Sequence, residues 1–542
     1  MTFIKNLKPI HFFLISLILF LPAFFINLGV QPFIDDEGIR GLVALEMIFS
    51  NDFITPTLSG EHYFKKPPLY NWIIAGFFEI TDTYNEFWLR FPAVCCLLFF
   101  TITIYLSLKK ELGEKIAVIT ALMFLTSGRI IIYESLHGLI DICYSWVIYS
   151  MFIIIYKLYH KNKLLWLFIL VYFLAAISYL MKGIPTLLFV GLTLLAYFIS
   201  ERKLKVLFSW YHFLGIIVFL TIISSYYYLY FSRNEVPANE IFSTLINEST
   251  RRTIVRFGIG KTLLNLLIFP FEQIYHFLPW SLFIVFIFRK DFIRVMIKNK
   301  FVKFNALIFI VNIIVYWTSP EVFPRYILML IPLFFTVIIY FYDNKIKSQH
   351  FLEKGILGLV FPVTIALSIT LLLFSSWLFP IIKTFLGFEI KYISIFIALA
   401  LILFIYFKIQ KFRIFTFVIF LLIFRIGFNW FVIPKRHLTM SAVISREEAK
   451  KVGKINKNKK LYTYWPSEIK PHPYYGKIIF KYNYLFYLTS QYGNVIEQKS
   501  KIEEDAIYLV KKRHYKSTLF EITDTLYSNG INSEVYLTKP LI

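Results

Sequence analysis

Residues 34–70 read IDDEGIRGLVALEMIFSNDFITPTLSGEHYFKKPPLY and lie between two apolar blocks of the chain. This stretch opens with the acids Asp35, Asp36 and Glu37, and it closes with a basic, aromatic turn over residues 63–68 that two prolines stiffen. Charged side chains beside a membrane are costly unless they are paired or functional. The stretch therefore predicts a site for a charged substrate at the edge of a bilayer.

The composition of the chain is that of a membrane protein. Of its 542 residues, 58% are hydrophobic and only 17% are charged, whereas soluble proteins are about 25% charged. The apolar residues form blocks of roughly 17–25 residues, the length that an α-helix needs to cross a bilayer. The net charge of +24 comes from lysines and arginines clustered in short loops, as the positive-inside rule predicts. We therefore expect an α-helical polytopic protein in contact with membrane lipids, with no nucleic-acid partner.

About thirteen segments are predicted to cross the membrane within residues 1–439. The first, at 10–30, is longer and more uniformly apolar than a signal-peptide core, so we interpret it as a retained span. The three cysteines, Cys95, Cys96 and Cys143, lie in apolar stretches without metal spacing and are interpreted as core residues rather than a disulfide framework. The remaining spans are predicted at 88–108, 115–132, 140–157, 164–181, 184–200, 206–231, 266–288, 304–318, 326–342, 355–379, 391–407 and 413–434.

The basic loops predict which side of the membrane each segment faces. Lysine-containing short loops follow spans two, four, six, eight, ten and twelve, so they share a side with the N-terminus, and that side is cytoplasmic. The first loop (31–87), a second polar segment (232–262) and residues 440–542 then lie outside. Within the first loop, Gly38–Phe49 and Leu69–Ile80 have the pattern of helices that lie in the membrane interface.

Residues 440–542 are predicted to form a small soluble α/β domain. Aromatic and aliphatic residues recur throughout this segment, which is unlike a disordered tail. Its β-rich runs alternate with helix-like segments. The predicted strands are Lys460–Tyr464, Ala506–Lys511 and Ser533–Thr538, and the predicted helices are Tyr484–Tyr492 and Ser517–Ser528.

Two groups of acids are candidate catalytic residues. Asp35, Asp36 and Glu37 could form an ordinary solvated loop, but three adjacent acids at the end of a span favour a functional role. A carboxylate there could act as a general base, hold a cation or bind a cationic sugar. Asp141 stands at the start of the fourth predicted span, where a helix cap is the alternative interpretation.

Several cations are predicted to lie on the same, outer side. Lys66 has a constrained, extended backbone because Pro67 follows it, and a lysine held at the interface is a natural partner for a lipid phosphate. Ordinary contact with lipid headgroups is the alternative. The other candidates are Lys65, Lys182, Arg251, Arg252, Arg256 and Arg325, each of which could instead be a solvated or snorkelling side chain.

These residues, taken together, resemble a known family. The first loop is similar to the signature of bacterial lipid A aminoarabinose transferases and of the wider protein O-mannosyltransferase-like GT-C families. The resemblance covers about residues 1–340. It rests on Asp36-Glu37, Asp52-Phe53-Ile54-Thr55-Pro56, Tyr63 to Tyr70, Asn85 to Pro92, Lys182-Gly183, Glu248 to Arg252, Leu278-Pro279-Trp280 and Pro324-Arg325-Tyr326.

The resemblance implies a glycosyltransferase of the bacterial inner membrane. Its fold has thirteen spans, and its active site and C-terminal domain face the periplasm. Its donor is a sugar on polyprenyl phosphate, and its acceptor is lipid A. Carried over to this sequence, the catalytic carboxylates are Asp36, with Glu37 beside it, and Asp141, and the residues around the donor phosphate are Lys66, Arg252, Tyr63, Lys65 and Arg325.

Two positions depart from the family pattern. Lys65 occupies a position where the transferases usually have a glutamate that is linked to metal binding, so a divalent cation stays an open option. Ser249 follows Glu248 where a histidine is often found. These departures leave the sugar, the acceptor and the metal open.

The charges suggest a mechanism but leave the acceptor open. Departure of polyprenyl phosphate builds negative charge that Lys66 and Arg252 would stabilise. An anionic lipid A phosphate needs no strong base, whereas a hydroxyl acceptor requires Asp36 to take its proton. A protein O-glycosyltransferase is therefore the alternative enzyme. A lipid or sugar transporter or flippase is the alternative of another class, although its inverted repeats and broken mid-membrane helices are not evident in the sequence.

Overall fold

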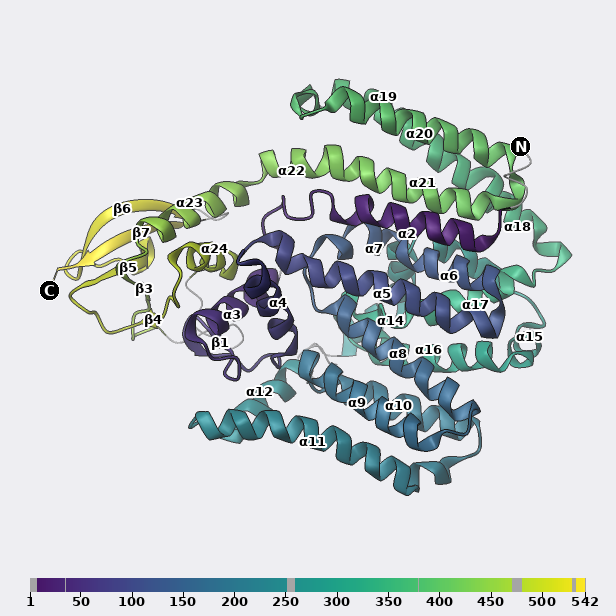
Figure 1. Cartoon of the computed structure of the whole chain (residues 1–542), viewed down its shortest axis with the longest axis horizontal. Coiled ribbons are helices and arrows are strands. Elements are labelled where there is room, and N and C mark those ends of the chain that lie inside the picture. Colours follow the sequence, from purple (N-terminus) through teal and green to yellow (C-terminus); the bar gives the residue numbers. More distant parts are fainter. Residues whose placement is uncertain are drawn as a thin grey trace.

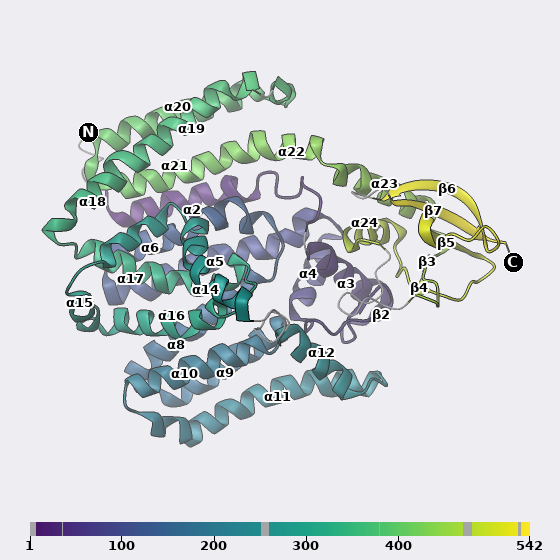
Figure 2. The ribbon, with the colours of Figure 1, turned by 180° about the vertical axis from the view of Figure 1, so that it is seen from behind.

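A computed structural model of the chain describes residues 7–34, 36–250, 259–378, 380–469, 480–528 and 533–541. Long helices form a bundle, and a small sheet domain lies at one end of it (Figure 1). The first-loop helices α3 (Glu37–Ser50) and α4 (Leu69–Thr81) lie between the bundle and the sheet domain, as the reverse view also shows (Figure 2). The first loop is therefore enclosed between two parts of the chain that are far apart in sequence.

The described residues confirm a multi-pass membrane protein. Eight of their helices are long and apolar enough to cross a bilayer. Six of them are α5 (Glu86–Leu112), α8 (Asp141–His160), α9 (Leu164–Lys182), α11 (Trp210–Arg233), α16 (Lys300–Trp317) and α20 (Phe388–Lys408). The other two are longer: Lys347–Ser375 overlaps α18 (His350–Gly355) and α19 (Phe361–Leu378), and Gln410–Leu438 overlaps α21 (Arg413–Gly427) and α22 (Ile433–Thr439). Shorter apolar helices are α2 (Pro9–Phe25), α10 (Pro185–Ser200) and α17 (Ile331–Asp343).

Helix α20 lies at the edge of the bundle (Figure 1). Apolar side chains occupy both of its faces, and the two faces differ only in what covers them. Its exposed side chains recur at helical spacing at Ile393, Ile397, Leu401 and Phe404, and its buried ones recur on the other face at Ile395, Leu399, Ile402 and Tyr406. The exposed face is the one that lipid chains would cover.

Two predicted spans are interrupted in the structure. The third is divided into α6 (Glu114–Leu125) and a second segment, Gly128–Leu136, at a bend of 44°; this segment contains α7 (Gly128–Ile132). The eighth is divided between α14 (Ile259–His276) and a 3-10 helix, η3 (Trp280–Ile287). Pro279 lies at the second break, and proline cannot donate the backbone hydrogen bond that would continue a helix. The backbone N–H of Gly128 donates to the Leu278 carbonyl at 2.7 Å, so the two breaks contact each other.

The first loop is more enclosed than a helix lying on a membrane surface. Both Arg40 and Glu46 of α3 are buried, and each has partners within the loop. The carboxylate of Glu46 accepts hydrogen bonds from the Thr57 hydroxyl and the Ser59 backbone N–H, at 2.7 and 2.6 Å, and so fixes a small hairpin to α3. The hairpin strands are β1 (Thr57–Leu58) and β2 (Glu61–His62).

The described residues of the C-terminal domain form two α-helices, α23 (Ser441–Ile455) and α24 (Tyr482–Tyr492), a short 3-10 helix, η10 (Lys512–His514), and a five-stranded sheet in the order β4-β3-β5-β7-β6. Strand β3 runs parallel to β4 and β5, whereas β7 is antiparallel to β5 and β6. The strands are β3 (Lys460–Tyr464), β4 (Gln498–Lys499), β5 (Ala506–Lys511), β6 (Phe520–Ser528) and β7 (Ser533–Pro540).

One predicted element of this domain is wrong. Residues 517–528 were expected to form a helix, but Phe520–Ser528 is strand β6, which pairs with β7. Thr523 and Thr525 favour a strand because β-branched side chains lose little freedom there. An irregularity between Ile522 and Asp524 shifts the register, and this bulge obscures the alternation that would have indicated a strand.

The remaining helices are short connections, except for α12 (Ala238–Thr250) in the second polar segment. The connections include 3-10 and π turns. They are α15 (Phe292–Lys298), η1 (Glu134–Leu136), η2 (Leu204–Phe208), η4 (Pro324–Ile327), η5 (Lys347–Gln349), η6 (Ile356–Val360), η7 (Pro380–Thr384), η8 (Gln410–Phe412) and η9 (Phe428–Val432).

Two glycines let α3 approach α24 closely. A Cβ atom at Gly38 would lie 2.0 Å from the Asn483 Oδ1 and 2.5 Å from the Asn483 backbone nitrogen, and one at Gly41 would lie 2.7 Å from the Phe486 ring. We expect Gly38→Ala to lower the free energy of unfolding by roughly 1–3 kcal/mol, because overpacking forces the two helices apart. The matched control is Gly76→Ala in α4, where a Cβ would meet nothing within 4 Å and stability should rise by up to about 1 kcal/mol. Thermal unfolding of the two purified variants in detergent measures both; equal stability of the variants would contradict the close packing.

Candidate active site

Three elements meet at the carboxylate of Asp141. Helix α8 begins at Asp141, helix α9 ends at Lys182, and Arg325 lies in η4. The Lys182 Nζ lies 2.5 Å from the Asp141 Oδ1, and the Arg325 Nε lies 3.5 Å from the Asp141 Oδ2. All three residues are largely buried, so the single carboxylate is shared by two cations. The group therefore keeps excess positive charge in a partly enclosed place.

Aromatic rings surround these two cations. The Lys182 Nζ lies 4.8 Å from the centre of the Tyr144 ring and 4.5 Å from the centre of the Tyr326 ring. The guanidinium of Arg325 lies 4.6 Å from the Phe323 ring centre. Burial opposes the charge of Arg325, but the Asp141 carboxylate, together with smaller contributions from Tyr326, Glu134 and Asp36, outweighs burial and raises the pKa of that guanidinium. Arg325 therefore stays charged at every physiological pH, and the rings offset part of the cost of burying it.

Lys66 belongs to the same electrostatic group. It follows the hairpin and precedes Pro67, whose ring holds the Lys66 backbone extended. Burial lowers the pKa of Lys66 to about 8, and the positive charges of Lys182 and Arg40 act in the same direction. The carboxylates of Glu248 and Asp141 oppose this shift. A small pocket opens beside Lys66, and its lining includes Tyr63, Pro67, Tyr226, Tyr230 and Leu245.

Asp36 and Tyr63 border this group in the first loop. Asp36 is exposed and precedes the first residue of α3. The Arg40 Nη2 donates to the Tyr63 hydroxyl at 2.7 Å. Burial raises the pKa of the Tyr63 phenol, and the negative charge of Asp36 adds to that increase. Asp36 thus offers a solvent-accessible carboxylate close to a buried tyrosine and to the cations.

Glu37 differs from its neighbour Asp36, because it is completely buried and its two oxygens are occupied. Its Oε1 accepts from the Arg90 Nε at 2.7 Å and from the Gly138 backbone N–H at 2.8 Å. Its Oε2 accepts from the Arg90 Nη2 at 2.9 Å and from the Ile34 backbone N–H at 3.0 Å. Burial opposes the charge of Glu37, but Arg90 outweighs burial and lowers the pKa of this carboxyl. Glu37 is therefore suited to orient the start of α3 rather than to contact a substrate.

Sequence reasoning did not single out Arg40 as a site residue. Arg40 follows Asp36 by four residues, and its backbone N–H donates to the Asp36 carbonyl at 3.1 Å. Residues four apart lie on the same face of a helix, so this spacing was the available signal. We call Arg40, Lys66, Lys182 and Arg325 the cationic cluster.

Five other predicted residues are not placed in the site by the structure. Lys65 is partly exposed next to Lys66. Asp35 and Arg252, with the neighbouring Arg251 and Arg256, lie outside the described residues. The described structure thus brings Asp36, Tyr63, Lys66, Asp141 and Arg325 together at one end of the helices, and their functional roles remain predictions.

The cationic cluster is suited to binding a phosphate group whose charge increases. The four cations interact with three acids, Asp36, Asp141 and Glu248, and the other acid near Arg325, Glu134, is already paired with Arg129. The cluster therefore has a surplus of positive charge. Fixed cations in a partly dehydrated site stabilise developing negative charge more strongly than water does. No group of three His, Cys, Asp or Glu side chains that could hold a metal occurs in the part of the chain that the structure describes. Because the Asp141 carboxylate is already engaged by two cations, these residues do not fit a metal centre, and we derive no step through one.

Comparison with known structures identifies the architecture. The chain is similar to the crystal structure of ArnT from Cupriavidus metallidurans bound to undecaprenyl phosphate, with a TM-score of 0.67 at 15% sequence identity, over 98% of this chain and 97% of that chain. This chain has the ArnT fold. The apo state of the same protein gives a TM-score of 0.66 at 14% identity with the same coverage.

Sequence comparisons agree with the ArnT fold. Residues 65–228 match the model of a family described as dolichyl-phosphate-mannose-protein mannosyltransferase. An uncharacterized protein of Aquifex aeolicus (strain VF5) is 24% identical over 388 residues, which are 69% of this chain and 72% of that protein. The resemblance to GT-C glycosyltransferases that the first loop indicated is therefore confirmed.

Proposed function

We propose that this protein is an integral membrane glycosyltransferase that moves a sugar from polyprenyl phosphate to lipid A or a related envelope glycolipid. The observation that carries the proposal is the cationic cluster gathered on Asp141 within an ArnT fold. The ArnT crystal structure with undecaprenyl phosphate supports a polyprenyl-phosphate lipid as donor. The positions of the basic loops support an active site and a C-terminal domain on the periplasmic side.

The charge change in the reaction explains what the cluster does. A sugar joined to polyprenyl phosphate is a phosphodiester with one negative charge, and breaking the bond between sugar and phosphate leaves a phosphate that bears a second one. Lys66, Lys182 and Arg325 stabilise this added charge, which is present only as the bond breaks. Asp36, at the exposed edge of the cluster, faces the sugar and the acceptor. It takes a proton from a hydroxyl acceptor, or it orients groups beside an acceptor that is already anionic.

A protein acceptor is the second candidate. It is favoured by the match of residues 65–228 to the family described as dolichyl-phosphate-mannose-protein mannosyltransferase. A serine or threonine hydroxyl of a protein must lose a proton, whereas a lipid A phosphate does not. The Asp36→Asn variant therefore separates the two acceptors: it abolishes transfer to a hydroxyl and leaves a measurable rate of transfer to a phosphate.

The test uses the purified full-length chain in liposomes. Wild type and Asp36→Asn are incubated with radiolabelled polyprenyl-phosphate sugars, together with lipid A in one experiment and with envelope protein in another. Label on lipid A supports the proposal, and label on protein replaces it with the second candidate. If no donor supports transfer by wild type, the enzyme proposal is overturned, and a lipid-flux assay in the same liposomes then tests a transporter.

The pKa of Lys66 predicts a pH dependence of binding of undecaprenyl phosphate, the carrier that remains after the sugar has left. Because this pKa lies near 8 in the folded protein, the free protein loses the Lys66 charge as the pH rises through that value. We expect the association constant for undecaprenyl phosphate to fall by about tenfold between pH 7 and pH 9. The ligand contributes little to this change, since the second pKa of a phosphate monoester is about 6.

A matched variant tests whether Lys66 causes this fall. Lys66→Arg keeps a positive charge up to a pH above 12, so its binding of undecaprenyl phosphate should stay level from pH 7 to pH 9. Binding is measured by the ligand-induced change in melting temperature in detergent across the pH series. The same decline in both proteins would assign the pH dependence to another group.

A further inference from the structure

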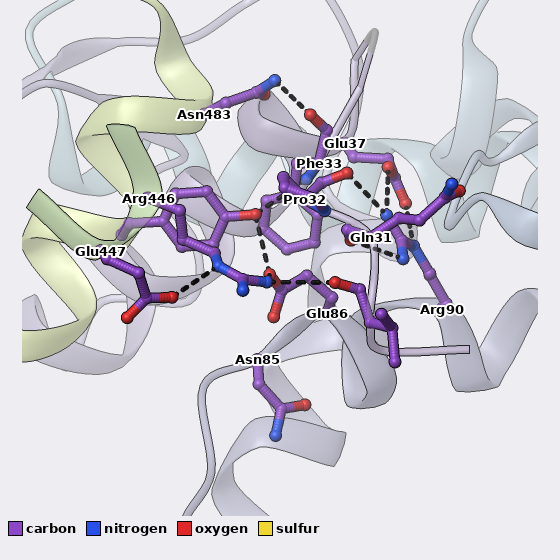
Figure 3. Close-up of polar contacts among 12 residues, drawn as sticks. Gln31, Pro32, Phe33, Glu37, Asn85, Glu86, Arg90, Arg446, Glu447 and Asn483 are labelled. Atoms are coloured by element: carbon purple, nitrogen blue, oxygen red, sulfur yellow. Dashed lines mark hydrogen bonds and ion pairs between the residues drawn. The ribbon is translucent and has the colours of Figure 1, made fainter. Parts of the chain in front are cut away.

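The chain segment that leads to Asp36 is held on one side by Arg90 of helix α5. The Arg90 guanidinium donates to the carbonyls of Leu28 at 2.7 Å, Gln31 at 2.9 Å and Pro32 at 3.2 Å. The remaining hydrogen-bonding capacity of this side chain is directed to Glu37 (Figure 3). A single buried arginine therefore holds the backbone at Leu28, Gln31 and Pro32 and the side chain of Glu37.

The other side of the same segment is held by the C-terminal domain. The Phe33 backbone N–H donates to the Tyr487 hydroxyl at 2.8 Å, and the Asn483 Nδ2 donates to the Phe33 carbonyl at 2.8 Å. Tyr487 and Asn483 are four residues apart and therefore occupy one face of α24. Phe33 precedes Asp36 by only three residues. Helix α24 therefore binds the backbone three residues before the exposed carboxylate.

Helix α23 contacts the same segment through a buried ion pair. The Arg446 Nη1 donates to the Glu86 Oε1 at 2.8 Å and to the Val30 carbonyl at 3.3 Å. The Tyr487 hydroxyl donates to the same Glu86 oxygen at 3.0 Å. Figure 3 shows two groups of polar contacts, one around Glu86 that includes Arg446 and Phe33 and one around Arg90 that includes Glu37 and Pro32. The peptide backbone between Pro32 and Phe33 joins them. Together the two groups connect the membrane helix α5, the C-terminal domain and the segment before Asp36.

We propose that the C-terminal domain positions Asp36 for transfer, with Tyr487, Asn483 and Arg446 as its positioning residues. These side chains do not reach the cationic cluster; they act through the backbone of residues 30–34. The inference rests on the proposed glycosyltransferase function for its effect on rate, but its effect on backbone order is independent of that function. According to this proposal, the C-terminal domain supports the transfer reaction itself and is not a separate module that binds the acceptor.

The test compares two tyrosines of α24. Tyr487 and Tyr492 are both buried, and the hydroxyl of each donates one hydrogen bond and accepts another. The partners of Tyr487 lie in the first loop and α5, whereas the partners of Tyr492 are backbone groups of Lys459 and Leu461 in its own domain. Replacing either residue by phenylalanine removes the same atom from the same helix. The Tyr492→Phe variant therefore controls for a general loss of stability.

The first readout is the rate of glycosyl transfer. We expect Tyr487→Phe to lower kcat by about tenfold or more with an unchanged KM for the donor, because a carboxylate displaced by a fraction of an ångström reacts much more slowly. Tyr492→Phe should retain the wild-type kcat. Equal losses in both variants, or a wild-type kcat in Tyr487→Phe, would overturn the proposal.

The second readout does not need activity. The amides of Glu37 and Arg40 donate to the carbonyls of Ile34 and Asp36, both at 3.1 Å. We expect faster hydrogen–deuterium exchange of these two amides in Tyr487→Phe and unchanged exchange in Tyr492→Phe. If the wild type transfers no sugar, this measurement alone decides, and unchanged exchange in Tyr487→Phe overturns the inference.

Discussion

Lys66→Ala is expected to lower the rate of glycosyl transfer by about 10²–10³-fold, the effect of removing one fixed group that stabilises developing charge. Lys66 is held by the backbone restriction of Pro67 and lies near Lys182 and Arg40. Its charge interacts with a phosphate that gains a second negative charge as the bond to the sugar breaks. The loss should therefore appear mainly in kcat, with a smaller change in the KM for the donor.

A second lysine provides the control for this prediction. Helix α8 has Asp141 of the site at its first residue, and Lys161, which is exposed, follows its other end. Lys161→Ala also removes one positive charge but should retain the wild-type rate. Transfer is measured in liposomes with the donor that wild type accepts. A wild-type rate in Lys66→Ala would remove Lys66 from the site, and an equal loss in Lys161→Ala would indicate a non-specific effect of net charge.

Arg90→Met is expected to cause the largest loss of stability, roughly 3–5 kcal/mol in the free energy of unfolding. The Arg90 and Glu37 side chains are 2% and 0% exposed, and two hydrogen bonds join them. Removing the arginine leaves a carboxylate inside the protein with only the backbone N–H groups of Ile34 and Gly138 as partners. The carbonyls that Arg90 holds together lose their donor as well.

A salt bridge of the same length provides the control. Lys115 and Asp343 are also 2.7 Å apart, but their side chains are 58% and 34% exposed. Lys115→Met should change the free energy of unfolding by less than about 1 kcal/mol, because water screens an exposed pair. Unfolding of both variants in detergent measures the difference, and similar losses in the two would contradict the dominant role of burial.

The Arg90–Glu37 pair also predicts how stability depends on pH. Arg90 lowers the pKa of Glu37 in the folded protein, so the unfolded chain binds a proton to this group at higher pH than the folded chain does. The contribution of Glu37 to stability is therefore complete above its unfolded pKa and is lost as the pH falls through the lower, folded value. In Arg90→Met the buried carboxylate has lost its cation, and this loss on acidification should disappear.

The membrane fold could be predicted from the sequence because hydropathy is a local property. Each apolar block is long enough to span a bilayer wherever its neighbours lie, so most predicted spans correspond to helices of the structure. The prediction of secondary structure failed where the local sequence pattern did not distinguish a helix from a strand. Residues 517–528 show no clear alternation because of the irregularity near Ile522, and the pairing of Phe520–Ser528 with β7 makes that part a strand.

The candidate site could be predicted from the sequence only in part. The acid and lysine loop is contiguous in sequence, so Asp36, Tyr63 and Lys66 could be selected by their residue types and by the prolines beside them. Glu37 could not be separated from Asp36 in this way. One of these adjacent acids is exposed and the other is saturated by Arg90, and no property of the sequence distinguishes them.

What the sequence determined by itself, then, is the class of protein, the approximate spans and the loop that carries charge, because each depends on interactions between near neighbours in the chain. Only the tertiary structure decided that Lys182 and Arg325 share the Asp141 carboxylate, and that Tyr487 holds the backbone before Asp36. These contacts join residues from 41 to 454 positions apart. Their energies depend on burial and on the distance between charges, which the packing of the helices creates.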